Sequence, residues 1–184
     1  MAENAGVTAV RSATEADHPA LLRVVEDAFG PDEGAKVAHL VTALEDAGHV
    51  RASLVAEVDG AVVGHVMLSR SWVDAERALV EVVVLSPLSV APTHHGQGIG
   101  GALLAAAVTE AERLGAPVVF LEGDPAYYST RGWQPAGPLG FTKPSTRIPD
   151  AAFQAIVLAG HEEWMSGALV YCDPFWELDC VGLR

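Results

Sequence analysis

The spacing of apolar residues changes along the chain from a helical period to a strand period and back. Near the N-terminus, Thr14 and Asp17 form a capping signal ahead of Pro19, a residue that suits the first turn of a helix. Apolar residues then recur every three or four positions in two segments separated by Gly30-Pro31, a pair that ends a helix. The pattern predicts a short strand over residues 7–11 and helices over about 19–29 and 32–47.

A strand period follows. Asp59-Gly60 separates two alternating segments and is a strong hairpin signal, because a type I′ turn needs positive φ at both central residues. The next apolar run is nearly continuous, as expected for a strand buried on both faces. Pro87 interrupts its extension, so we expect a bulge or splayed pairing there. The strands are predicted over residues 53–58, 61–68 and 79–85.

Helical and extended segments alternate in the rest of the chain. A third helix is predicted from Gly98 to about Leu114, with Gly115 as its stop. The later elements are a strand over 118–121, a short helix around 126–131, and strands near 154–158 and 167–171. This order predicts a mixed α/β domain.

Composition narrows the class of protein. The 184 residues suit one domain, which we place at 7–184 behind a flexible N-terminus at 1–6. Eleven basic and 24 acidic residues give a net charge of −13, so we expect no nucleic-acid partner, since that affinity comes mainly from Lys and Arg. The charge fits solubility or a cationic partner. With two cysteines, no leader and no long apolar run, we expect a cytoplasmic protein that makes no membrane contact.

A glycine-rich turn lies between a predicted buried strand and a helix. Backbone N–H groups in such a turn are unobstructed, and the helix N-terminus adds attraction for phosphate, so the turn predicts an anion cradle. Gly96, Gly98 and Gly101 also match the dinucleotide fingerprint, with Glu122 at the ribose-binding distance. Too little chain follows for the second half of a dinucleotide-binding sheet, but a nicotinamide-dependent oxidoreductase stays an alternative.

Three motifs in one order resemble the GNAT superfamily of acyl-CoA N-acyltransferases, over nearly the whole chain. They are Val62-Val63-Gly64-His65 in the hairpin, Val90-Ala91-Pro92 followed by His95-Gly96-Gln97-Gly98-Ile99-Gly100, and Tyr127-Tyr128-Ser129-Thr130-Arg131-Gly132-Trp133. The resemblance extends to a bacterial branch of predicted N-acetyltransferases. It implies a mostly antiparallel mixed sheet flanked by helices, with strands splayed at the cofactor site. It also implies acetyl-CoA as co-substrate, with the acetyl group moving by direct attack to a primary amine on a small molecule or a protein.

The resemblance assigns cofactor binding to the strand end and to the turn. In the family, the strand backbone pairs with the pantetheine arm and the loop amides bind the pyrophosphate. His95 stands where the family usually has Gln or Arg. Two adjacent histidines, His94 and His95, with no further ligand set predict no metal site. The expected cofactor-binding residues are Leu88, Ser89, Val90, His95, Gly96, Gln97, Gly98, Ile99, Gly100, Gly101 and Ala102.

Catalysis needs an acid for the leaving thiolate and an acceptor for the amine proton. The resemblance places Tyr128 at the general-acid position, and packing beside Trp133 is its structural alternative. Glu81 is our candidate base, because it is the one charge in an apolar strand; a solvated place at the strand's start is its alternative. Glu122 and Asp124 could cap the short helix, and His65 fits a core position. A non-catalytic CoA-binding domain and a homodimer both stay open.

Overall fold

The computed structural model describes residues 9–182, so the expected flexible N-terminus at 1–6 lies outside the described residues. Contacts divide the described chain into two compact units. The first holds the residues up to 68 together with 86–109, and the second holds 69–85 and the residues from 110 onward. The helices and strands are β1 (Ala9–Ser12), α1 (His18–Asp46), β2 (Val50–Val58), β3 (Ala61–Ala75), β4 (Leu79–Val90), α2 (Ile99–Arg113), β5 (Val118–Glu122), α3 (Pro125–Tyr128), β6 (Gln134–Pro135), β7 (Phe141–Thr142), β8 (Phe153–Val157), β9 (Gly167–Tyr171) and α4 (Asp173–Glu177).

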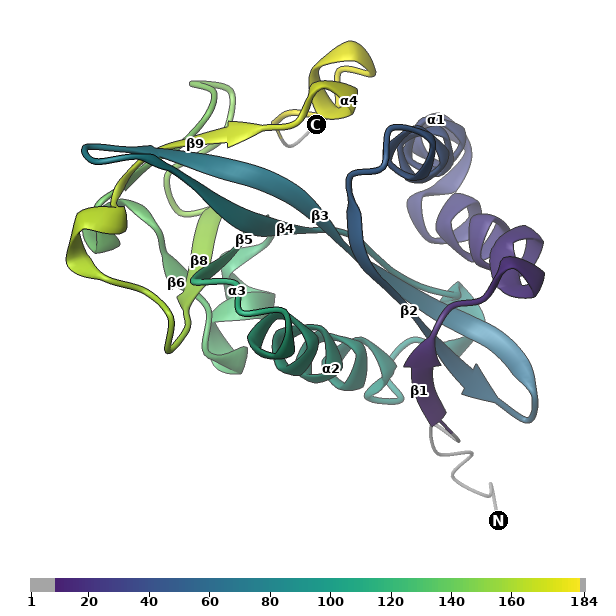
Figure 1. The fold of residues 1–184 in the computed structure, drawn as a ribbon. Helices are drawn as coiled ribbons and strands as arrows, with labels where there is room; N and C mark the ends of the chain where they lie inside the picture. The colour runs from purple at the N-terminus through teal and green to yellow at the C-terminus, as the bar shows by residue number, and fades with distance from the viewer. Residues whose placement is uncertain (1–8, 183–184) are drawn as a thin grey trace. The chain divides into compact units, whose positions relative to one another are not determined.

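The sheet is mixed and mostly antiparallel, as expected. Hydrogen-bonded neighbours follow the order β1-β2-β3-β4-β5-β8-β6, and β9 pairs with β3 and β7 (Figure 1). The pairs β4–β5 and β7–β9 are parallel, whereas β1–β2, β3–β9, β5–β8 and β6–β8 are antiparallel. The β3 and β4 strands each run through both units, because their sequences cross the division.

In the first unit, the predicted hairpin and helix break are both present. Asp59 and Gly60 have φ values of 50° and 79°, which the turn between β2 and β3 requires. The two predicted helices follow each other directly as the two halves of α1. The helix is interrupted between them at Gly30, where φ is 75° and ψ is −174°. The core residues of this unit are buried on α1, β2 and the start of α2, and include Leu21, Val25, Val41, Leu44, Val55, Ile99 and Leu103.

The second unit is built on β5, whose first four residues are buried. Phe120 stacks on Phe153 of β8, with ring centroids 5.6 Å apart, and meets the edge of Phe141 at 4.9 Å. The β4 strand pairs with β5 at Val83 and Val84, ahead of Pro87, so the expected bulge or splay at that proline stays a prediction. The pattern missed β6, β7 and α4, which are two to five residues long and too short to show a period.

Candidate functional site

The glycine-rich turn follows β4 in the first unit and folds back on the strand. The Ala91 amide donates to the Val63 carbonyl at 2.8 Å, which ties the end of β4 to β3. A 3₁₀ turn then spans Pro92–His94. The His95 ring returns to the strand, and its Nε2 lies 2.9 Å from the Val90 carbonyl oxygen. Because a carbonyl oxygen only accepts, Nε2 carries the proton of this hydrogen bond.

The next residues expose their backbone. Gly96 and Gly98 have φ values of 76° and 81°, and both are exposed. A Cβ added at either glycine would meet no other described atom within 4 Å. Their left-handed conformation suits glycine, and the open space leaves their amides accessible. The α2 helix begins directly afterwards at Ile99.

The first turn of α2 decides which amides are available for an anion. The Ala102 amide donates to the Gly98 carbonyl at 3.0 Å and is the first hydrogen bond of the helix. The resemblance puts Ala102 among the cofactor-binding residues, and its part in binding pyrophosphate stays a prediction; the amide itself already donates within the helix. The amides that precede it in the first turn have no partner within a helix, so the available set is Gln97 to Gly101.

The loop segment carries no acidic side chain and no lysine or arginine. The sequence from 86 to 109 contains no Asp, Glu, Lys or Arg, in a chain with a net charge of −13. His94 lies within the same turn, with Nδ1 3.0 Å from the Thr93 hydroxyl. Within this segment, the groups that can attract a phosphate are therefore the oriented N–H groups, the helix dipole and the two histidines.

The strand that precedes the loop holds the other expected cofactor-binding residues. Ser89 is buried, and its hydroxyl oxygen has no hydrogen-bond partner among the described residues. Leu88 and Val90 alternate with it and are half-buried. The Val90 carbonyl accepts a hydrogen bond from His95 and keeps one lone pair for a second donor.

Tyr128 lies in the second unit, at the end of α3. Asp124 caps this helix by accepting a hydrogen bond from the Ala126 amide at 2.9 Å, as the sequence suggested. The phenol ring packs edge-on against Tyr127 and Trp133, and a Cβ at Gly123 would overlap it. Burial raises the pKa of Tyr128 to about 12, so the phenol is protonated near neutral pH.

Glu122 does not cap α3. Its carboxylate accepts hydrogen bonds from the Tyr171 hydroxyl at 2.7 Å and from the Gly182 amide at 3.0 Å. Burial raises the pKa of the Glu122 carboxyl, against these two bonds, which lower it. The carboxylate thus joins the end of β5 to β9 and to the last described residue, a clamp that the sequence pattern did not reveal.

Glu81 lies on the first half of β4 and is exposed. Its carboxylate forms an ion pair with Arg70, with Nε 2.9 Å from the oxygen, and the guanidinium lies 5.0 Å from the ring centre of Trp72. The pair gives Glu81 a solvated structural setting in the second unit.

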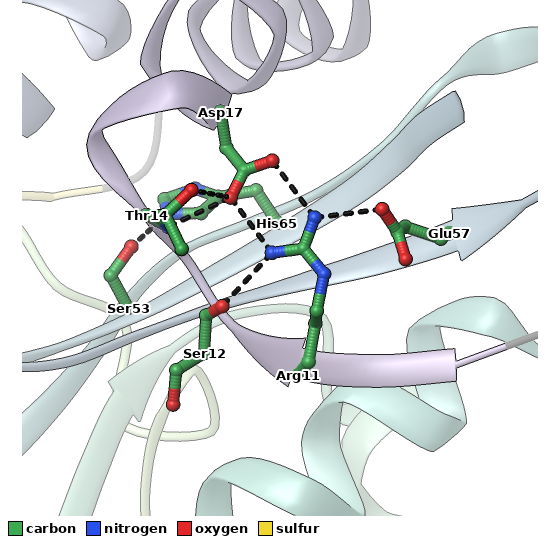
Figure 2. Close-up of polar contacts among 7 residues, drawn as sticks. All are labelled: Arg11, Ser12, Thr14, Asp17, Ser53, Glu57 and His65. Carbon is green, nitrogen blue, oxygen red and sulfur yellow. Dashed lines mark hydrogen bonds and ion pairs between the residues drawn. The ribbon is translucent and has the colours of Figure 1, made fainter. Parts of the chain in front are cut away.

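His65 faces a polar cluster in the first unit, which Figure 2 shows. The ring is fully buried, with Nε2 3.0 Å from the Ser53 hydroxyl and Nδ1 without a partner among the described residues. Burial, and to a smaller extent the charge of His18, lowers the pKa of His65 to about 4. The ring is therefore a neutral core histidine with one of its two nitrogens satisfied.

The same view shows how β1 is joined to the 3₁₀ turn that precedes α1 and to β2. Arg11 makes a two-pronged ion pair with Asp17 at 2.7 and 2.9 Å and reaches Glu57 at 2.7 Å. Asp17 also accepts from the Thr14 amide and hydroxyl, which completes the predicted capping box. These bonds hold the pKa of Asp17 well below its usual range, with the Arg11 hydrogen bond as the largest cause.

The aromatic residues near the C-terminus pack within the second unit. Phe175 is buried against Tyr171, with centroids 4.9 Å apart, whereas Trp176 is exposed. The Arg77 guanidinium lies 5.6 Å from the ring centre of Trp164. Among residues 9–182, no helix is long and apolar enough to cross a membrane.

Comparison with known proteins places the chain in a family. The open mixed sheet and the strand–glycine loop–helix turn define an acyltransferase fold, and the family model described as an acetyltransferase (GNAT) domain matches residues 9–136. The uncharacterized N-acetyltransferase YjhQ of Escherichia coli is 32% identical over 146 residues, which cover 76% of this chain and 80% of YjhQ. The chain therefore belongs to the GNAT family of acetyl-CoA-dependent N-acetyltransferases.

Two solved structures resemble more than nine-tenths of the chain. The GNAT family N-acetyltransferase YhbS of Escherichia coli in complex with CoA has a TM-score of 0.82 and 26% identity, and the alignment covers 95% of each chain. A GNAT family acetyltransferase of Brucella melitensis in complex with acetyl-CoA has a TM-score of 0.73 and 28% identity, over 91% of this chain and 97% of that one. Acetyl-CoA is thus the co-substrate of the family fold found here.

Proposed function

We propose that residues 88–102 bind acetyl-CoA and that the enzyme transfers its acetyl group directly to a primary amine. The observation that carries this proposal is the exposed loop at Gly96 and Gly98, which runs into the unbonded first-turn amides of α2. The expected binding set is that of the sequence, and it includes Ala102, whose amide already donates within the helix. The backbone from Leu88 to Val90 pairs with the pantetheine arm as an added strand.

In the proposed reaction, the amine nitrogen attacks the thioester carbonyl. A C–N bond forms, the C–S bond breaks, and the thiolate of CoA takes a proton. We assign that proton to Tyr128, whose phenol carries its proton near neutral pH and whose pKa burial raises further, to about 12. Solvent then restores the proton to Tyr128, so the residue returns to its starting state.

The proton of the attacking amine needs an acceptor. Glu81 is the candidate base of the proposal, and its carboxylate is paired with Arg70 in the structure. Water is the competing acceptor, since a partly deprotonated amine needs no protein base. Substitution of Glu81 distinguishes the two acceptors, because only the first depends on its carboxylate.

The wider setting of the reaction belongs to the same proposal. We place the enzyme as a single acyltransferase domain in the cytoplasm, where the thiols of Cys172 and Cys180 remain reduced. The acceptor is an amine of a small molecule or a protein, and the net charge of −13 suits a cationic acceptor. A homodimer is a further expectation, which light scattering after size exclusion would test.

Binding at the loop is tested by Gly98→Asp. This change adds bulk and negative charge at a residue with φ of 81°, so acetyl-CoA binding should be lost while the chain stays folded. Calorimetry measures the binding, and circular dichroism checks the fold. Wild-type protein should gain thermal stability from acetyl-CoA and none from NADH, whereas stabilisation by NADH would favour the oxidoreductase alternative.

The catalytic assignments are tested by Tyr128→Phe and Glu81→Gln in parallel. Loss of the Tyr128 phenol should lower kcat about 100-fold or more with little change in acetyl-CoA affinity. Glu81→Gln should lower kcat most below neutral pH, where the amine is most protonated. If a variant keeps the wild-type rate, the substituted residue has a structural role. If the wild-type enzyme releases no CoA thiol with any amine of a broad panel, the chain is better described as a non-catalytic CoA-binding domain.

A further inference from the structure

The exposed part of the loop is held at its two ends. At one end, the His95 ring donates to the carbonyl of Val90, the last residue of β4. At the other end, the Ile99 side chain is 1% exposed and lies where a Cβ on Gly64 would come within 3.0 Å of its Cγ2. Gly96, Gln97 and Gly98 lie between these two points and are exposed.

The two ends are held by different forces. Ile99, the first residue of α2, is fixed because its side chain packs in the core. This packing does not depend on the conformation of the loop. His95 is itself exposed, so its ring is fixed by the hydrogen bond to Val90. Without that bond, the segment from Pro92 to Gly98 would still have the backbone bonds of the 3₁₀ turn, from His94 to Ala91 and from His95 to Pro92. At its far end, the Gly98 carbonyl would still accept from the Ala102 amide.

We propose that His95 is a positioning residue for acetyl-CoA, acting through the Val90 carbonyl. The ring closes the turn onto the end of β4 and sets the direction of the amides that follow it. The inference rests on the proposed binding of acetyl-CoA at this loop. His95 stands where the family usually has Gln or Arg. The inference gives its side chain the role of hydrogen-bond donor, a role that a Gln amide can also fill.

Preorganisation explains why the bond affects affinity. A loop that is disordered before binding must lose its conformational freedom when the pyrophosphate arrives, and that loss reduces affinity. One neutral hydrogen bond contributes modestly to such ordering, so its removal should weaken acetyl-CoA binding about three- to tenfold. The chemical step should be unaffected, because His95 does not contact the reacting atoms in this role.

The experiment compares His95→Gln with His95→Ala and His95→Phe. Gln keeps a donor without an ionisable ring, Ala removes the side chain, and Phe keeps an aromatic ring but has no donor. We expect the Ala and Phe variants to raise the KM for acetyl-CoA and the Kd for CoA about three- to tenfold, with kcat within about twofold. The Gln variant should restore both values to within about twofold of wild type.

His39→Ala serves as the matched control, because His39 is an exposed histidine of α1 outside the loop. It should leave KM, Kd and kcat unchanged. Three results would overturn the inference: wild-type KM and Kd in the Ala and Phe variants, no recovery in the Gln variant, or a fall in kcat with KM unchanged. Absence of CoA binding in the wild type would instead overturn the proposed cofactor site, so the two failures are distinguishable.

Discussion

At the scale of single residues, the polar side chains of the first unit carry the pH dependence of stability. His65 is buried with a pKa of about 4, below its ordinary value of 6.5, so the unfolded chain binds its proton more readily than the folded chain. Asp17 acts at a lower pH. Its pKa is lowered in the folded chain, so its hydrogen bonds stabilise the fold fully above the ordinary pKa of 3.8, and this stabilisation is lost as the carboxylate is protonated. Both groups weaken the fold as the pH falls.

The contribution of His65 can be measured alone. Between about pH 7 and about pH 4.5, protonation of the unfolded chain should cost the wild type about 2–3 kcal/mol of unfolding free energy at this residue. His65→Gln has no titrating ring and should lose that part of the pH dependence. Urea denaturation at the two pH values measures it, with His39→Gln as the exposed control. Equal slopes in wild type and His65→Gln would contradict the buried neutral ring.

At the scale of elements, local patterns with strong chemistry were predictable. The Asp59-Gly60 turn and the Gly30-Pro31 break were confirmed because each depends on backbone preferences of two adjacent residues. The pairing of β9 with both β3 and β7 was not predictable, since it joins β9 to a part of β3 about 100 residues earlier and to a strand of two residues. Tertiary packing, rather than local propensity, forms those edges.

The closeness of β3 to α2 is the element contact on which the loop depends. A Cβ on Gly64 would lie 2.8 Å from Leu103 Cδ1 and 3.0 Å from Ile99 Cγ2, so β3 meets the first turns of the helix at this glycine. Gly64→Val should therefore push the start of α2 away. We expect a loss of about 1–3 kcal/mol in stability, measured by urea denaturation, together with a raised KM for acetyl-CoA.

Gly160→Val is the matched control for that change. The nearest atom to a Cβ at Gly160 is 3.7 Å away, an ordinary contact, and its φ is not in the left-handed region. This variant should leave the KM for acetyl-CoA unchanged. A Gly64→Val protein that loses stability but keeps a wild-type KM would show that the start of α2 shifts without affecting cofactor binding.

At the scale of the whole molecule, the family followed from the sequence, whereas many long-range contacts of the described residues did not. The order of three motifs was enough to predict the fold, and the comparisons confirm that prediction. The bonds from Glu122 to Tyr171 and Gly182 span 49 and 60 residues, and no periodicity encodes them. The loss of the Ala102 amide to the helix likewise depends on where α2 begins, a boundary that sequence patterns locate only to within a few residues.

The charge of the molecule makes one property of the site testable as a whole. The net charge is −13, and residues 86–109 include no Asp, Glu, Lys or Arg, so under the proposed binding mode the phosphates of acetyl-CoA approach a repelling protein and meet neutral N–H groups. Salt screens long-range repulsion, with a Debye length of about 10 Å at 0.1 M, but affects short backbone bonds little. Affinity for acetyl-CoA should therefore hold or rise by up to about threefold between about 20 and about 200 mM NaCl.

A single added charge should reverse that salt dependence. Gln97 is exposed in the loop, so Gln97→Lys places an ammonium among the amides and introduces a screened attraction for phosphate. Calorimetry over the same salt range should show tighter binding than wild type at low salt and a several-fold loss at high salt. If the wild type itself weakened by more than about threefold with salt, charged side chains from elsewhere in the chain would have to bind the phosphates, and the backbone cradle would not account for recognition.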